Sequence, residues 1–127
     1  MHKEAFTLFP ATVINADTPT DAFDCANFDA FMCRMTLSGL GTSQGCRPLL
    51  QALMPDGTTW VTIAATTTQQ TTNSSFLYQF GRATAAGGGQ VTETINIGVP
   101  RICRLLLDVV NANDCTAKIE MLPIQAI

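Results

Sequence analysis

Apolar and polar residues alternate with a period of two along much of this chain. Between residues 28 and 40, alternate positions carry the apolar side chains of Phe31, Cys33, Met35 and Leu37. The same spacing recurs at Cys103, Leu105, Leu107 and Val109, and again at Cys115, Ala117, Ile119 and Met121. Because successive side chains of a β-strand point to opposite faces, these sets predict three strands, each with one face toward a core.

Shorter apolar runs separated by turn-forming residues predict the remaining strands. They cover residues 5–14, 46–54, 60–63, 76–80 and 91–97. Residues 15–21 are rich in Asn, Asp, Thr and Pro, which predicts a loop. No segment of the chain combines helical periodicity with caps. Many short strands broken by turns are typical of an all-β antiparallel sandwich or barrel.

Two hairpins are expected. Pro55-Asp56-Gly57-Thr58 predicts a tight turn, since proline fixes φ and Asp-Gly tolerates positive φ. A second turn at residues 111–114 predicts that the two closing strands pair with each other. Their outer faces would then pair Arg104 or Asp108 with Lys118 or Glu120.

The chain of 127 residues has the length of one domain. We assign residues 15–127 to a single β-sandwich domain and residues 1–14 to an N-terminal arm or edge strand, because Pro10 interrupts that run. Phe6, Leu8 and Phe9 are candidate assembly contacts, since large apolar side chains on a free arm gain stability by packing on a neighbour. The alternative is that this run is the first strand of the sandwich.

Charged residues make up 13% of the chain, against roughly 25% in an average soluble protein. Such a surface suits large protein contacts, because few charges lose water on docking; small viral or extracellular β-domains can also simply use Thr and Ser in place of Lys and Glu. The net charge is −3 and the seven basic residues are scattered, so we expect no nucleic-acid partner. No apolar stretch has the ~18 residues of a membrane span, so we expect no membrane partner.

We expect no catalytic residue, cofactor or metal site. The one histidine, His2, lies where chain ends are commonly disordered. The five cysteines form no CxxC pair and their number is odd, which favours buried thiols in a chain made in a reducing cytoplasm.

The segment from Pro55 to Trp60, followed by Val61-Thr62-Ile63-Ala64, resembles the D-G-x-x-W hairpin of small structural proteins from tailed bacteriophages and prophages. A Thr/Gly-rich middle and the pair Pro100-Arg101 before the closing strands extend the resemblance from Phe28 to the C-terminus. It implies a jelly-roll-like antiparallel β-sandwich, made in the host cytoplasm. It also implies a place on the capsid exterior of the virion, where the chain decorates or cements the shell.

The partners implied by this resemblance are the major capsid protein or other virion proteins. The resemblance also implies a homo-oligomer, with a trimer as one arrangement, by analogy with capsid accessories on threefold axes. A second hypothesis is a carbohydrate- or receptor-binding module of a phage tail or head fibre, with Trp60, Phe76 and Tyr78 as candidate exposed aromatic contacts. A lattice-forming protein of a cell surface or compartment is a third. An enzyme ranks last.

Overall fold

The computed structural model describes residues 5–26, 28–82, 91–111 and 113–125. The first four residues of the predicted arm, which include His2, lie outside these ranges. The described residues form ten strands: β1 (Phe6–Ile14), β2 (Thr18–Pro19), β3 (Phe23–Asp24), β4 (Phe28–Ser38), β5 (Gly45–Leu53), β6 (Trp60–Ala65), β7 (Ser75–Gly81), β8 (Glu93–Ile95), β9 (Ile102–Val110) and β10 (Cys115–Gln125).

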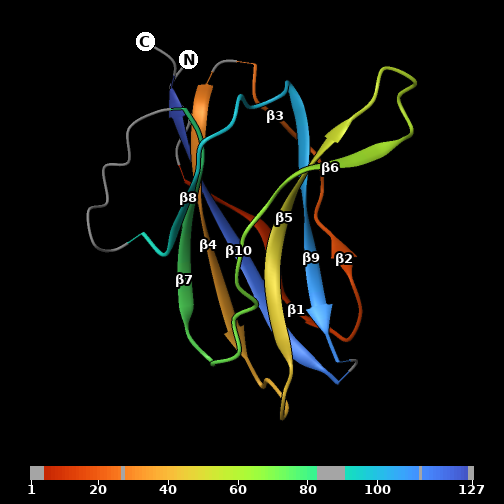
Figure 1. Ribbon diagram of the computed structural model, residues 1–127, viewed down its shortest axis with the longest axis vertical. Coiled ribbons are helices and arrows are strands. Elements are labelled where there is room, and N and C mark those ends of the chain that lie inside the picture. Colours follow the sequence, from red (N-terminus) through yellow and green to blue (C-terminus); the bar gives the residue numbers. More distant parts are fainter. Residues whose placement is uncertain (1–4, 27, 83–90, 112, 126–127) are drawn as a thin grey trace.

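The strands form two sheets that stack face to face as a β-sandwich (Figure 1). The first sheet has the order β1-β10-β4-β7-β8, and the second has the order β2-β9-β5-β6, with β3 also paired to β9. All pairs are antiparallel except β7 with β8, which is parallel. The all-β sandwich predicted from the alternation is therefore confirmed.

The pairing follows a simple rule along the chain. β1 pairs with β10, β2 and β3 pair with β9, β4 pairs with β7, and β5 pairs with β6. The first half of the chain thus pairs with the second half in reverse order, like one long hairpin with its tip between β5 and β6. This ribbon then folds across itself, so that β10 also pairs with β4 and β9 with β5. The result is the double-sheet arrangement of a jelly roll.

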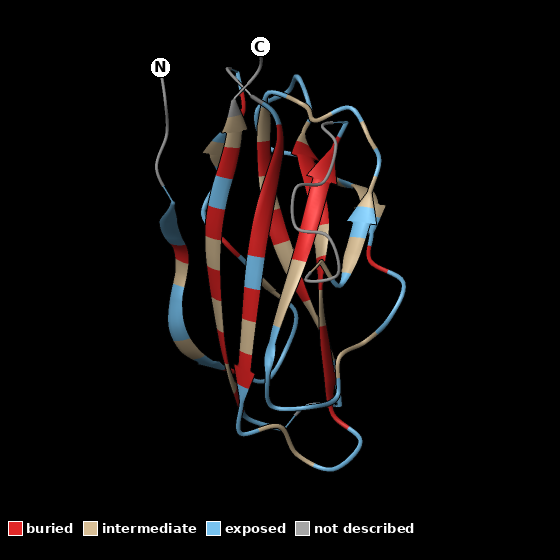
Figure 2. Cartoon of the chain, turned by 90° about the vertical axis from the view of Figure 1, so that its left-hand side faces the viewer, coloured by how far each residue is buried: buried red, intermediate tan, exposed pale blue. Residues whose placement is uncertain are grey.

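The core lies between the sheets and is formed by the predicted alternating sets (Figure 2). Phe31 stacks on Phe80, with ring centroids 5.3 Å apart, and meets Phe23 edge-on at 5.2 Å. Burying such aromatic side chains stabilises the fold by about 1.5–3 kcal/mol each before packing geometry is counted. Of the predicted core positions, Val109 is partly exposed, near the end of β9.

The predicted turn at residues 55–58 joins β5 to β6. Gly57 adopts a φ of +77°, a conformation that glycine reaches without steric cost. The Asp56 carboxylate accepts hydrogen bonds from the backbone amides of Thr58 and Thr59, at 2.9 and 2.8 Å, and from the Thr59 hydroxyl. This hairpin projects from the upper right of the sandwich in Figure 1.

The predicted pairing of the two closing strands is wrong. β9 belongs to the second sheet and β10 to the first, so the turn at residues 111–114 crosses from one sheet to the other. Asp108 accepts a hydrogen bond from Arg47 of β5, and Glu120 accepts one from Arg34 of β4. Local alternation shows which face of a strand is buried, but it carries no information on which strand lies beside it.

Residues 15–21, expected to form a loop, contain β2. Thr18 and Pro19 are in register with Leu107 and Leu106 of β9. The Thr20 hydroxyl also accepts a hydrogen bond from the Leu105 amide at 3.1 Å. Two-residue strands with a proline leave no periodic pattern, which explains why the sequence did not predict this edge.

Candidate interaction surface

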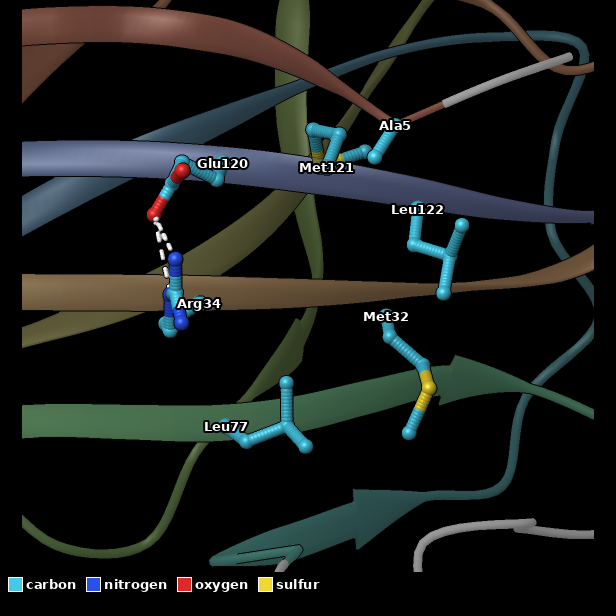
Figure 3. A pocket seen from close by; sticks show the side chains of 7 residues that line it. All are labelled: Ala5, Met32, Arg34, Leu77, Glu120, Met121 and Leu122. Atoms are coloured by element: carbon cyan, nitrogen blue, oxygen red, sulfur yellow. Dashed lines mark hydrogen bonds and ion pairs between the residues drawn. The ribbon is translucent and has the colours of Figure 1, made fainter.

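An apolar groove runs across the outer face of the first sheet (Figure 3). Three neighbouring strands each supply one outward-facing apolar side chain: Leu122 from β10, Met32 from β4 and Leu77 from β7. Leu122 is in register with Met32. Ala5 and the backbone side of Met121, whose side chain faces the core, also border the groove.

The groove measures about 220 Å³, which is less than the roughly 300–1,000 Å³ of typical small-molecule pockets. Its size therefore suits one inserted side chain of a partner protein better than a cofactor or substrate. Leu122 is 44% exposed, so contact with a partner would remove a substantial apolar area from water.

The polar end of the groove is an ion pair. The Arg34 guanidinium donates two hydrogen bonds to one Glu120 carboxylate oxygen, at 2.9 and 2.6 Å, and Lys118 lies 3.8 Å from the other oxygen. The hydrogen bond from Arg34 holds the pKa of Glu120 below its usual range. The two charges that line the groove, Arg34 and Glu120, are thus matched to each other within the sheet.

The N-terminal candidates do not form a free apolar arm. β1 is the edge strand of the first sheet and pairs with β10. Leu8 is buried in the core and Phe9 packs against it, so the expectation that Leu8 contacts another subunit is wrong. Phe6 is 40% exposed and stays a candidate assembly contact. Register shifts between Thr7 and Thr12 interrupt the open edge of β1, which disfavours strand addition there.

Of the three aromatic candidates, Tyr78 is not exposed. It has 0% exposure, and burial raises the pKa of Tyr78 to about 12. Phe76 is half-buried against the core. Trp60 is half-buried at the start of β6, where the Arg104 guanidinium carbon lies 4.5 Å from its ring centroid.

A polar network covers the outer face of the second sheet beside Trp60. Arg104 donates to Oε1 of the Gln51 side chain at 2.8 Å, and Nε2 of the same side chain donates to the Thr62 hydroxyl at 3.2 Å. Arg47 donates to Asp108 at 2.9 Å. These polar groups form hydrogen bonds with one another. Fewer of them are therefore left free to bind a ligand than the number of polar residues on this face would suggest.

All five cysteines are free and buried, as predicted. Burial raises the pKa of Cys33 and of Cys46 to about 12. Among the described residues, no three His, Cys, Asp or Glu side chains gather closely enough to hold a metal ion. Those residues also contain no helix long and apolar enough to cross a membrane.

Sequence reasoning missed the groove, although its signal was present. Met32 and Leu77 occupy positions that the alternation assigns to the outer face, where Arg34 and Thr36 are polar. Leu122 likewise follows the inward-facing Met121. Apolar residues at outward positions of adjacent strands predict a contact surface; here Leu122 is exposed, Leu77 is half-buried and Met32 is buried.

No protein-family model, curated protein or solved structure matches this chain.

Proposed function

We propose that this protein is a structural component of a bacteriophage particle that decorates or cements the capsid. It attaches through the groove on the outer face of the first sheet. The observation that carries this proposal is the apolar stripe of Met32, Leu77 and Leu122, which ends at a matched Arg34–Glu120 ion pair.

Such a face is suited to protein contact for a physical reason. Moving an unpaired charge out of water is costly, whereas burying apolar surface is favourable. The groove supplies apolar area, and its two charges already neutralise each other. A partner that inserts one apolar side chain therefore gains affinity without a large desolvation penalty.

The fold and the sequence resemblance support the location. Jelly rolls are common among viral capsid and lectin domains, although a fold by itself does not determine function. The Asp56-Gly57 hairpin with Trp60, similar to that of tailed-phage structural proteins, favours the capsid over other assemblies. The partner is then the major capsid protein or another virion protein, and the protein itself assembles as a homo-oligomer, with a trimer as the arrangement to test.

The proposal is tested by quantitative mass spectrometry of particles purified from the virus that encodes the chain. A decorating protein is present in hundreds of copies per particle, whereas a tail or vertex fitting is present in a few. Absence from purified particles contradicts the proposal.

The attachment face is tested with Leu122→Lys in the same particles. Losing the burial of one leucine removes about 1.5–3 kcal/mol, which corresponds to about tenfold to hundredfold weaker attachment. Met54→Lys is the matched control, because Met54 is 43% exposed, close to the 44% of Leu122, but lies at the β5–β6 turn. If both variants lose attachment to the particle equally, or if neither loses it, the contact lies elsewhere on the protein.

A carbohydrate- or receptor-binding module is the second candidate, favoured by the position of Trp60 and Arg104 on an outer sheet face. Its test is glycan-array binding by the purified chain. Binding that Trp60→Ala abolishes, while Met54→Ala on the same hairpin leaves it intact, supports this alternative. An array without signal removes it.

A further inference from the structure

Cys25 and Cys103 lie on the same face of one short antiparallel ladder. Phe23 of β3 is in register with Cys103 of β9, and the Cys25 amide continues the ladder by donating to the Arg101 carbonyl oxygen at 2.6 Å. Side chains two residues apart on a strand share a face. Cys25 is therefore the diagonal neighbour of Cys103, and both face the core.

The two thiols influence each other's ionisation. The neighbouring thiol raises the pKa of Cys25 and lowers that of Cys103. The Cys103 thiol also donates a hydrogen bond to the Pro100 carbonyl oxygen at 3.3 Å. Since the thiolate is the reactive form of cysteine, Cys103 is the thiol of the pair that ionises first.

The other cysteines lack this arrangement. Cys46 and Cys115 belong to opposing sheets, β5 and β10, and influence each other electrostatically. Cys33 lies in β4, where burial alone raises its pKa. The Cys25–Cys103 pair is thus distinguished by its shared ladder and by the effect of each thiol on the pKa of the other.

We propose that Cys25 and Cys103 are a site of covalent modification, at which a peroxide converts the two thiols to a disulfide that closes β3 onto β9. This chemistry goes beyond the proposed capsid role and does not depend on it. Disulfides persist on the surfaces of released particles and in other oxidising surroundings, whereas a reducing cytoplasm keeps such thiols free.

The reaction balances with hydrogen peroxide as the oxidant. The Cys103 thiolate attacks one peroxide oxygen, the S–O bond forms, the O–O bond breaks, and the released hydroxide leaves as water with the Cys103 proton. The Cys25 sulfur then attacks the sulfenic sulfur, the S–S bond forms and the S–O bond breaks. The second hydroxide leaves as water with the Cys25 proton. Two thiols lose two electrons and two protons, and one peroxide is reduced to two waters.

Closing the bond requires a small movement. Diagonal partners on a ladder lie about 7–8 Å apart, while disulfides prefer Cα separations of about 4.4–6.8 Å. β3 is two residues long and stands at an edge, so it can shift without breaking a long ladder. The product would fix an edge segment that otherwise rests on few backbone hydrogen bonds.

The experiment treats the purified full chain with hydrogen peroxide, quenches it, unfolds it and alkylates the remaining thiols. We expect three of the five cysteines to be alkylated, with a mass loss of two hydrogens and a cross-linked peptide joining Cys25 to Cys103. Cys25→Ser abolishes the link, and Cys33→Ser, the matched control in the same core, retains it. A link between Cys46 and Cys115 instead, or oxidation to sulfinic acid without a link, overturns the proposal.

Thermal unfolding gives a second readout that does not depend on alkylation. Oxidised wild-type protein is expected to unfold at a higher temperature than the reduced protein, because the cross-link restricts the unfolded chain. Peroxide treatment of Cys25→Ser gives no such rise. A similar rise in both proteins assigns the effect to another site and contradicts the proposal.

Discussion

Gly81 of β7 lies directly against Ala30 of β4: a β-carbon at position 81 would stand 2.5 Å from the Ala30 α-carbon. Gly81 also has a φ of +123°, a conformation that side chains strongly disfavour. Two neighbouring strands of the first sheet therefore approach so closely here that only glycine fits.

Gly81→Ala is expected to destabilise the fold by about 2–5 kcal/mol, because strain and overpacking add. Gly39→Ala is the matched control. Gly39 has a φ of +69° but open space around it, so its cost is limited to about 1–2 kcal/mol of backbone strain. Urea unfolding of both variants measures the difference, and equal costs would show that close packing at Gly81 contributes nothing.

The crossing of the closing strands between sheets predicts which charges are coupled. Arg47 and Asp108 form a half-buried ion pair across β5 and β9. A double-mutant cycle with Arg47→Ala and Asp108→Ala is expected to give a coupling free energy of about 0.5–1 kcal/mol. The same cycle between Lys118 and Asp108 is expected to give none. A measurable coupling free energy in the second cycle would instead support direct pairing of β9 with β10.

The aromatic stack predicts where the core is most sensitive. Phe31 contacts both Phe23 and Phe80 and has no exposed surface. Phe31→Ala is expected to cost about 3–5 kcal/mol, since transfer and cavity contributions add. Phe31→Leu refills much of the cavity and should cost clearly less. Chemical denaturation compares the two, and a loss below about 1 kcal/mol for alanine would contradict the packing described above.

The β5–β6 hairpin predicts a specific dependence on pH. Hydrogen bonds from the Thr59 hydroxyl and the amides of Thr58 and Thr59 lower the pKa of Asp56 from 3.8 to about 2. A lowered folded-state pKa means that the unfolded state binds the proton more tightly. The Asp56 contribution to stability is therefore complete above about pH 4 and is lost as the pH falls toward 2.

Asp56→Ala is expected to lower the unfolding temperature at neutral pH and to flatten its dependence on pH between about 4 and 2. Thermal scans across that range measure both effects. Asp21→Ala, an exposed carboxylate in another loop, is the control. An unchanged slope in Asp56→Ala would show that the carboxylate does not cap the turn.

The sequence predicted which residues are inside because that information is local. Phe31, Met35 and Leu105 belong to sets of apolar residues that recur at every second position, and the pleat of a strand converts this directly into a buried face. The turn at Asp56-Gly57 was also local, since its backbone conformation depends on the residues themselves.

Strand partners were not predictable in the same way. Judged from charge alone, Lys118, which is near Asp108 along the chain, is as good an ion-pair partner as Arg47. Which of the two lies beside Asp108 depends on how the whole chain is arranged in the two sheets. Tyr78 was predicted to be an exposed aromatic contact because a carbohydrate- or receptor-binding sandwich presents aromatic side chains on an exposed face. In the structure, Tyr78, Gln79 and Phe80 are consecutive and all buried, so the two-residue period does not mark an exposed face there.

β10 lies between β1 and β4, although it is the last strand of the described chain. During synthesis, β1 and β4 leave the ribosome well before the strand that joins them. Until residues 115–125 emerge, both strands present unpaired backbone groups to solvent and to other nascent chains. Completion of the first sheet therefore waits for residues 115–125, and the yield of folded protein will depend on how quickly this strand inserts.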